Sequence, residues 1–314
     1  MGPEPGARLR GRCCVVTGAS GGVGAAIASA LAGLGARVAL LARNRSRLQE
    51  LTARLTAAGG TVLAVACDCS QVEQVETARS AITTAWGDAE VLVNAAGTCG
   101  SLATVAASDP ADWIQTLQTN LIGPYLMTRS LLPGMLRRGW GRIISLGSAA
   151  SLHPPGALTS AYAVSKAALD RFTRQVACEI LGSGVTINVI HPGEVRTEMW
   201  QAIHDQAAAA GPAAAGLRAW AALVERTGGD PPEAAAALVL RIIKDAQLQG
   251  RFLWIENGVQ EPLPSWEPAD QTNSSAEAAH PVLQHLRPQP PQPPLHPLHP
   301  LHPLHHRGHH QGQP

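Results

Sequence analysis

Aromatic side chains are scarce in this chain of 314 residues: they make up 4% of it and include only two tyrosines and two phenylalanines. Its core must therefore be built mainly from aliphatic residues. One of the two tyrosines, Tyr162, stands four residues before Lys166. Four residues are about one turn of a helix, so both side chains should leave the same face. The pair is a candidate chemical device, and a solvated helix face is the alternative.

An excess of charge of one sign is also missing, since 24 basic and 23 acidic residues leave a formal net charge of +1. This balance gives no electrostatic reason to expect nucleic acid or an acidic membrane as a partner. Glycines interrupt the uncharged stretch at residues 13–36, which argues against a signal peptide or a membrane span. We therefore expect a soluble, cytoplasmic protein that binds neither nucleic acid nor membrane.

The cysteines do not form the pattern of a disulfide framework or a metal site. Six of them are scattered, mostly through apolar segments, and Cys67 and Cys69 form a lone C-x-C without a second pair. The spacings of zinc sites and of paired catalytic carboxylates are missing from the segments that read as folded. The sequence therefore predicts reduced, buried thiols and no metal.

Short apolar runs alternate with amphipathic segments along most of the chain. The apolar runs lie at residues 13–18, 37–42, 61–67, 91–97, 142–148, 185–193 and 251–255. The amphipathic segments between them lie at residues 24–34, 44–57, 71–86, 109–138 and 162–181. Continuous apolar strands that alternate with helices are typical of a parallel sheet covered on both faces. We predict an α/β fold of three layers (α/β/α) with a doubly wound parallel sheet.

Two segments depart from this rhythm. Residues 198–232 are rich in Ala and Gly and follow the sixth strand, at the edge where open α/β sheets bind ligands. They are interpreted either as a substrate lid or as a surface pair of helices. Residues 259–314 are rich in Pro and His and cannot build a packed core. The prediction is one folded domain over residues 10–258 followed by an extended or disordered tail.

A glycine-rich turn, TGASGGVG, follows the first apolar run and opens the first amphipathic segment. Glycine allows the backbone to turn tightly and to approach a phosphate. The N-terminus of the following helix offers unpaired N–H groups and the positive end of its dipole to a pyrophosphate. The context predicts a dinucleotide site. Its expected binding residues are Gly18, Ser20, Gly22, Val23 and Gly24.

The end of the second apolar run indicates which dinucleotide binds. An acidic residue there would bind the ribose 2′-hydroxyl of NAD(H). Here Ala42 is followed by Arg43, so no carboxylate repels a 2′-phosphate and a guanidinium can bind one. NADP(H) is therefore the predicted cofactor, with NAD(H) as the alternative. Arg45 and Arg47 suit the solvated start of a helix.

Residues 10–258 resemble the short-chain dehydrogenase/reductase family in its common form, which has a Rossmann-type fold. The resemblance rests on motifs in the family's order: TGxxxGxG at 17–24, Asp68, NAAG at 94–97, Asn120, Ser148, Tyr162-x3-Lys166 and PGEVRT at 192–197. The chain departs from the family pattern at Ala95 and His191, and neither change removes a catalytic group.

The resemblance also implies roles and partners. The additional cofactor-binding residues that it implies are Asp68, Asn94, Gly97, Tyr162, Lys166, Pro192, Val195 and Thr197. Lys166 would bind the nicotinamide ribose, and the loop at 192–197 would contact the nicotinamide carboxamide. The family commonly forms homodimers and homotetramers, so we expect one of these.

The chemistry of hydride transfer fits the pair formed by Tyr162 and Lys166. Reduction of a carbonyl leaves an alkoxide that needs a proton, and Tyr162 can donate one. Free tyrosine has a pKa of about 10, and a neighbouring ammonium such as Lys166 would lower it toward the working range. Ser148, at the end of the fifth run, can hold the substrate oxygen, and the family pattern selects it over Ser145 and Ser151.

Asn120 is the fourth predicted catalytic residue. Pro124, four residues later, has no N–H for the carbonyl of residue 120 and should kink the helix there. The free carbonyl could bind a water, which matches the family's proton relay through Lys166. The alternative is a helix that simply ends near Gly123.

The sequence thus predicts an NADP(H)-dependent oxidoreductase that interconverts a carbonyl and a secondary alcohol of a small-molecule substrate. One alternative is a non-catalytic NADP-binding sensor or scaffold whose tail recruits partners. A sugar-nucleotide epimerase, a second alternative, usually has a differently spaced glycine-rich turn.

Overall fold

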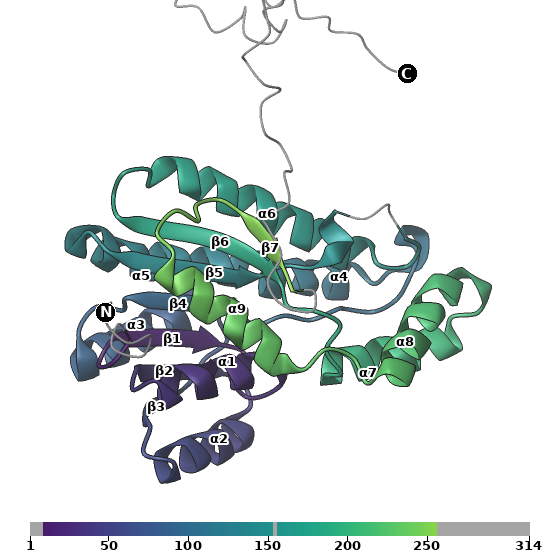
Figure 1. Ribbon diagram of the computed structural model, residues 1–314. Helices are drawn as coiled ribbons and strands as arrows, with labels where there is room; N and C mark the ends of the chain where they lie inside the picture. Colours follow the sequence, from purple (N-terminus) through teal and green to yellow (C-terminus); the bar gives the residue numbers. More distant parts are fainter. Residues whose placement is uncertain (1–8, 153–155, 256–314) are drawn as a thin grey trace, which may run out of the picture. The chain divides into compact units, whose positions relative to one another are not determined.

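A seven-stranded parallel sheet runs through residues 9–152 and 156–255, the part of the chain that the computed structural model describes (Figure 1). The strand order is β3-β2-β1-β4-β5-β6-β7. The strands are β1 (Cys13–Thr17), β2 (Arg37–Ala42), β3 (Thr61–Ala66), β4 (Val91–Asn94), β5 (Gly141–Leu146), β6 (Val185–His191) and β7 (Phe252–Trp254). The predicted doubly wound sheet is confirmed. The domain limit at 258 and the tail at 259–314 lie outside the described residues.

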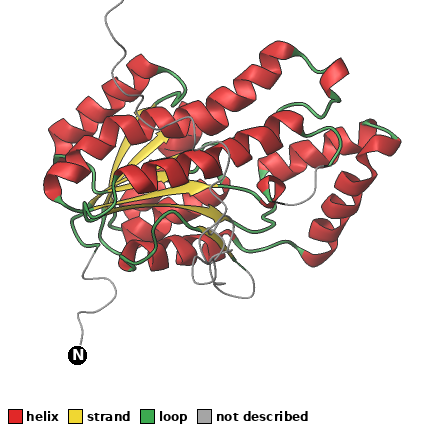
Figure 2. Ribbon diagram, turned by 90° about the horizontal axis from the view of Figure 1, so that it is seen from above, coloured by secondary structure: helices red, strands yellow, loops and turns green. Residues whose placement is uncertain are grey.

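Helices cover both faces of the sheet, as the view from above shows (Figure 2). They are α1 (Gly22–Gly33), α2 (Arg45–Ala57), α3 (Val72–Trp86), α4 (Pro110–Leu117), α5 (Gly123–Arg138), α6 (Ser160–Glu179), α7 (Glu198–Ala209), α8 (Ala215–Thr227) and α9 (Pro232–Lys244). The sequence analysis predicted no helix at the residues of α9, which follow the Ala-rich insertion at 198–232. No described helix combines the length and the apolarity that crossing a bilayer requires.

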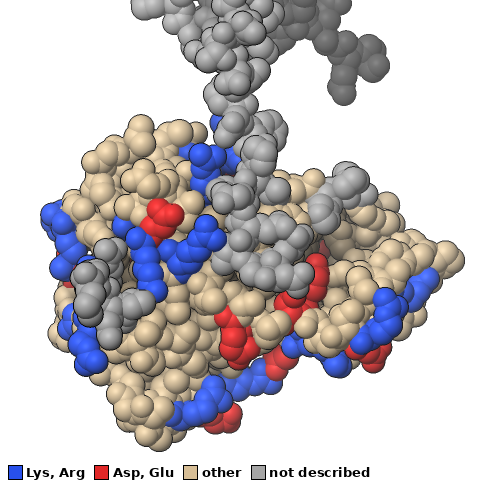
Figure 3. Space-filling model, viewed as in Figure 1, with Lys and Arg blue, Asp and Glu red and all other residues tan. Residues whose placement is uncertain are grey.

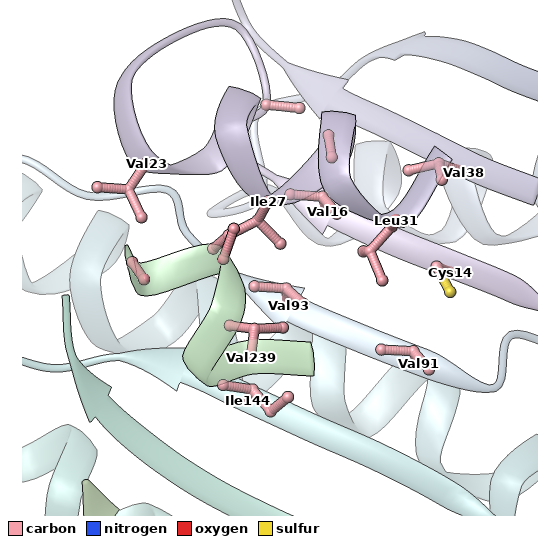
Figure 4. Close-up of a cluster of buried hydrophobic side chains, with 14 of the residues drawn as sticks. Cys14, Val16, Val23, Ile27, Leu31, Val38, Val91, Val93, Ile144 and Val239 are labelled. Atoms are coloured by element: carbon pink, nitrogen blue, oxygen red, sulfur yellow. The ribbon is translucent and has the colours of Figure 1, made fainter. Parts of the chain in front are cut away.

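The strands read as continuous apolar runs because alternate residues point to two different cores. On one face, Val16, Val93 and Ile144 of neighbouring strands pack against Ile27 of α1 and Val239 of α9 (Figure 4). On the other face, a second buried cluster joins β1, β4, β5 and β6 to α3, α5 and α6. The two cores fix the sheet, and with it the edge at which its strands end.

The helix predicted at residues 109–138 changes its hydrogen-bond pattern instead of ending. Residues 118–122 form a π turn between α4 and α5, and the N–H of Gly123 bonds to the carbonyl of Gln118, five residues back. A π turn is a known response where the i to i−4 ladder is interrupted, and Pro124 interrupts it here. The alternative in which the helix ends near Gly123 is therefore wrong.

The surface charges and the cysteines agree with what the composition predicts, except at one cysteine. On the face shown in Figure 3, uncharged surface dominates, and acidic side chains accompany the basic ones. All six cysteines are free and five are buried, whereas Cys178 is exposed. The prediction of a buried thiol is wrong at Cys178 because this residue of α6 faces away from the sheet.

The central core can be tested at Ile144 of β5, which is fully buried. Replacing it with alanine removes apolar contacts and leaves a cavity, so Ile144→Ala should lower the free energy of unfolding by about 2–5 kcal/mol. Leu181 is 78% exposed, and Leu181→Ala should change that free energy by less than about 0.5 kcal/mol. Urea unfolding followed by circular dichroism measures both. Similar losses in the two variants would contradict this account of the core.

Candidate active site

A cavity of ≈ 930 Å³ opens where the parallel strands end. Its walls come from the loops that follow β1 to β6, together with α6 and the insertion after β6. Open α/β sheets bind ligands at this edge because the loops there converge from neighbouring strands. The predicted site residues that line the cavity are Gly18, Ser20, Gly22, Val23, Gly24, Arg43, Asp68, Gly97, Ser148, Tyr162, Lys166, Pro192, Val195 and Thr197.

The glycine-rich turn leaves room for a phosphate group. Helix α1 begins at Gly22, and its N-cap Gly21 has no side-chain cap, so the first-turn N–H groups have no side-chain partner. A side chain at Gly24 would clash with the carbonyl of Gly18, and one at Gly18 would lie 2.6 Å from the N atom of Ala96. The cradle therefore exists only with glycine, and its exposed amides fit the pyrophosphate of a dinucleotide.

Two arginines lie at the far end of the cavity, after β2. Arg43 follows the strand and is exposed, as a residue that meets a ligand from solvent must be. Asn44 caps α2 by accepting the N–H of Arg47 at 3.1 Å. Arg47 also lines the cavity and forms an ion pair with Glu198, the first residue of α7. The sequence placed Arg47 on a solvated helix start and missed this pairing across the cavity.

Tyr162, Lys166 and Ser148 meet at the opposite end. The ammonium of Lys166 lies 5.6 Å from the centre of the Tyr162 ring, as one helical turn of α6 predicts. The same ammonium donates to the carbonyl of Leu146, at the end of β5, at 2.7 Å. Ser148 lines the same cavity, accepts the N–H of Ala150 on its hydroxyl oxygen at 3.2 Å and interacts with the phenol. Helix α6 and strand β5 thus hold all three groups in one place.

Burial controls the protonation of this pair. Desolvation raises the pKa of Tyr162 above its ordinary value; the hydrogen bond with Ser148 opposes the rise, and the charges of Cys99 and Glu194 add to it. Desolvation lowers the pKa of Lys166 to about 8, although the charge of Asp170 opposes the change. The sequence expected the lysine to lower the pKa of the tyrosine. The shift runs the other way, because desolvation is the largest influence on the phenol.

Asn120 lies behind the cavity wall and does not line it. It is fully buried, and its side-chain oxygen accepts the N–H of Thr98 at 2.8 Å. Its side-chain nitrogen donates to the carbonyl of Thr98 at 2.8 Å and to the hydroxyl of Ser165 at 3.0 Å. A side chain at Gly97 would lie 3.4 Å from this oxygen and 3.8 Å from the ammonium of Lys166. Asn120 therefore joins the loop after β4 to α6 close to Lys166.

Asn94 also differs from its expected place. It is the last residue of β4, only 2% exposed, and its side-chain nitrogen donates to the hydroxyl of Ser145 on β5 at 3.2 Å. Its side-chain oxygen is buried without a hydrogen-bond partner. Asn94 therefore lies between two central strands and does not line the cavity, and its contact with the cofactor stays a prediction.

The insertion after β6 forms a wall of the cavity. Residues 198–232 contain α7 and α8, a packed pair of helices, so the prediction of a helical pair describes their structure. The insertion also contributes cavity-lining side chains, as expected of a lid: Glu198, Met199, Trp200, Ile203, Leu217 and Trp220. Two tryptophans in one insertion of a chain so poor in aromatics were a signal that the sequence analysis did not use.

His191 and Glu194 line the cavity together with Ser148 and Tyr162, and neither was predicted as a site residue. The ring nitrogen Nδ1 of His191 accepts the N–H of Ala149, next to Ser148, at 3.4 Å. Its ring packs edge-on against Trp254 of β7, with 4.7 Å between the ring centres. His191 therefore supports the Ser148 loop from β6. In the described ranges, no group of three His, Cys, Asp or Glu side chains is arranged to hold a metal ion.

Comparison with known proteins gives a consistent result. The family model described as short chain dehydrogenase matches residues 12–208. Carbonyl reductase family member 4 of Danio rerio is 31% identical over 249 residues, which are 79% of this chain and 98% of that protein. The 3-oxoacyl-[acyl-carrier-protein] reductase FabG of Vibrio cholerae is 31% identical over 252 residues, 80% of this chain and 98% of that protein. A short chain dehydrogenase of Pseudocercospora fijiensis is 35% identical, over 61% of this chain and 62% of its own length.

Solved structures extend the similarity to the fold. An actinorhodin polyketide ketoreductase crystallised with NADPH has a TM-score of 0.71 and is 28% identical, over 78% of this chain and 95% of that one. A metagenomic short-chain oxidoreductase in complex with NADP has a TM-score of 0.64 and is 29% identical, over 79% of this chain and 97% of that one.

The buried ammonium makes a testable contribution to stability. An unfolded chain should hold the Lys166 proton up to its ordinary pKa of 10.5, whereas the folded chain loses it near pH 8. The unfolded state thus binds more protons between these values, so folding becomes more favourable as pH rises through them. The free energy of unfolding of the wild type, minus that of Lys166→Met, should rise by roughly 3 kcal/mol from pH 8 to 10.5.

Urea unfolding of the ligand-free proteins at several pH values measures this difference. Lys244, at the end of α9, is the only other lysine in the chain, and Lys244→Met is the matched control for the loss of an ammonium. A pH-independent difference for Lys166→Met, or an equal slope for the control, would count against a desolvated Lys166.

Proposed function

Because this chain belongs to the short-chain dehydrogenase/reductase family, we propose that it is an NADP(H)-dependent oxidoreductase that interconverts a carbonyl and a secondary alcohol. The observation that carries the proposal is the meeting of Tyr162, Ser148 and Lys166 in one cavity at the end of the sheet. A sensor or scaffold would need the dinucleotide cradle but not this acid–base group. A small-molecule carbonyl or alcohol is therefore the proposed substrate.

The cradle and the arginines support NADP(H) as the cofactor. The first-turn amides of α1 would hold the pyrophosphate, and Arg43 would bind the 2′-phosphate. Two similar structures contain NADPH or NADP. When bound, the cofactor supplies or accepts the hydride. Val195 and Thr197, in the loop after β6, would contact its nicotinamide end.

In the direction of reduction, Tyr162 gives its proton to the alkoxide oxygen. Because burial raises the pKa of the phenol, Tyr162 holds this proton at neutral pH until negative charge develops on the substrate. Ser148 donates a hydrogen bond to the same oxygen and stabilises that charge. Lys166, protonated below about pH 8, then lies beside the phenolate and favours it over a phenolate in a wholly apolar site. Oxidation of the alcohol reverses each step.

The proton must return to Tyr162 from solvent, and Asn120 is the proposed positioning residue for this route. The residue holds Thr98 and Ser165 in place next to Lys166. The π turn around it, which Pro124 imposes, is a local departure of the kind that often marks a functional site. We propose that a water held near the backbone of Asn120 passes the proton to Lys166 and then to the phenol.

A homodimer or homotetramer is the proposed assembly. Apolar side chains on α4, α5 and α6 are exposed in the described chain: Ile114 is 53%, Tyr125 42% and Val164 46% exposed. A second copy would remove this surface from water.

The general acid is tested by Tyr162→Phe, which removes one hydroxyl. This variant should bind NADPH as the wild type does and turn over at least ~100-fold more slowly, because the proton donor is lost. Loss of NADPH absorbance with a panel of ketones, quinones and acyl thioesters measures turnover, and fluorescence titration measures affinity. Tyr125→Phe, at the only other tyrosine, is the control and should keep normal turnover. Near-normal turnover of Tyr162→Phe would reject the role, and NADPH binding without turnover of any carbonyl by the wild type would favour a sensor.

Arg43→Ala tests the choice of cofactor. A charge-assisted bond to the 2′-phosphate is worth about 1.5–3 kcal/mol, so the NADPH affinity should fall roughly 10- to 100-fold while the NADH affinity changes little. Titration of both nucleotides against the variant measures the two effects. Arg45→Ala, at an exposed arginine outside the cavity lining, is the control. Equal losses for the two nucleotides in Arg43→Ala would remove Arg43 as the 2′-phosphate reader.

A further inference from the structure

The substrate end of the cavity contains a carboxylate that the reaction does not use. Glu194 follows Pro192 and Gly193 in the loop between β6 and α7, and its side chain is 40% exposed. It lines the same cavity as Ser148 and Tyr162. Its charge acts on the phenol, since it is one of the groups that raise the pKa of Tyr162. A substrate carbonyl placed between Ser148 and Tyr162 therefore has an acidic side chain nearby.

Hydrogen bonds hold this carboxylate in place. Its Oε2 atom accepts the indole N–H of Trp220 on α8 at 2.6 Å, and its Oε1 atom lies 3.6 Å from Nε2 of His191. The backbone N–H of Glu194 donates to the carboxylate of Asp230 at 2.7 Å, and its carbonyl accepts the N–H of Asp230 at 3.0 Å. Trp220 thus holds the side chain of Glu194 and Asp230 holds its backbone, which keeps the carboxylate beside the cavity.

Few of the other side chains that line this end carry a positive charge. His191 lies beside Glu194, and Arg196, outside the lining, has its guanidinium 4.8 Å from the centre of the Trp200 ring. Apolar and aromatic groups of the insertion form the wall next to Glu194: Trp200, Ile203 and Leu217. Among the described residues, Lys166 is the only lysine or arginine that lines this end of the cavity. Its ammonium donates to the carbonyl of Leu146. Arg43 and Arg47 line the opposite end, after β2. A substrate carboxylate or phosphate would meet a like charge here.

Resting on the function proposed above, we propose that Glu194 determines substrate specificity: the enzyme selects carbonyl compounds that are neutral or cationic near the reacting carbon and rejects those with a carboxylate or phosphate there. A hydroxyl or an ammonium can donate to Glu194, because a carboxylate accepts several hydrogen bonds. An anionic group cannot, and two like charges in a partly desolvated cavity repel each other.

The test compares three ketones that differ only in one terminal group: hydroxyl, carboxylate or trimethylammonium. Glu194→Gln removes the charge and keeps an oxygen that can accept the indole N–H of Trp220. In this variant kcat/KM for the carboxylate ketone should rise about ten-fold relative to the hydroxyl ketone, and that for the trimethylammonium ketone should fall. Unchanged ratios would overturn the proposal.

Two controls separate charge from the position of the insertion. Trp220→Phe removes the indole donor and keeps the carboxylate, so it should keep the wild-type order of the three ketones. The wild-type preference should also weaken as salt is raised, because salt screens charge. If Trp220→Phe changes the ratios as Glu194→Gln does, or if salt leaves the preference unchanged, the selection comes from shape and the proposal fails.

Binding measurements distinguish failure of this proposal from failure of the proposed function. The affinities of the same three ketones for protein saturated with NADP⁺ can be measured by calorimetry. Charge-dependent binding that Glu194→Gln abolishes, without turnover of any ketone, would reject the reductase and keep the role of Glu194. Turnover of the ketones, with equal binding of all three by the wild type and by Glu194→Gln, would keep the reductase and reject the role of Glu194.

Discussion

The desolvation of one ammonium is the constraint on which the candidate site depends. Lys166 is 4% exposed and donates to the carbonyl of Leu146, where β5 ends. Asp170 follows one turn later on α6; burial raises its pKa to about 6, and Ser151, Lys166 and Arg174 oppose the rise. With the pKa of Lys166 near 8, both groups are charged around neutral pH. A buried charge is costly, which is typical of functional rather than purely structural positions.

The fold holds this ammonium in place through elements that are distant in sequence. Asn120 bonds to Thr98 after β4 and to Ser165 next to Lys166, so the π turn, the β4 loop and α6 form one unit. His191 of β6 supports the backbone beside Ser148. The parallel sheet brings the ends of these strands to one edge, and the two buried cores on its faces keep them there. Chemistry and packing therefore share the same residues at this edge.

Local patterns predicted much of this arrangement. Seven apolar runs became seven strands. All but the edge strand β3 are largely buried, and strands buried on both faces need apolar residues at every position. The glycine-rich turn and the spacing of Tyr162 and Lys166 are also local, and the structure places these residues in one cavity. Pro124 predicted an interruption of the helix without showing that a π turn would carry the chain through it.

Features that depend on burial or on distant pairs could not be predicted in this way. Arg47 and Glu198 form an ion pair although a large part of the chain separates them, and neither residue has a distinctive local context. The direction of the pKa shift of Tyr162 depends on how much water the folded site excludes. Asn94 belongs to a family motif. Its hydrogen bond to Ser145 depends on the register between β4 and β5, which the sequence does not show.

Charge is divided along the cavity, and this division bears on how two ligands would share it. At the end after β2, Arg47 pairs with Glu198, and Asp68 also lines the cavity. Arg43 is therefore the basic group that favours a phosphate there. Glu194 lies at the end with Tyr162 and Lys166. A dinucleotide carries its phosphates on one side of the nicotinamide, so Arg43 at one end and Glu194 at the other favour one orientation over its reverse. An anionic group of a substrate would also be favoured beside Arg43, in the part of the cavity that the cofactor should fill. Selection against anions beside Glu194 would therefore keep the two parts of the cavity from competing for the same ligand.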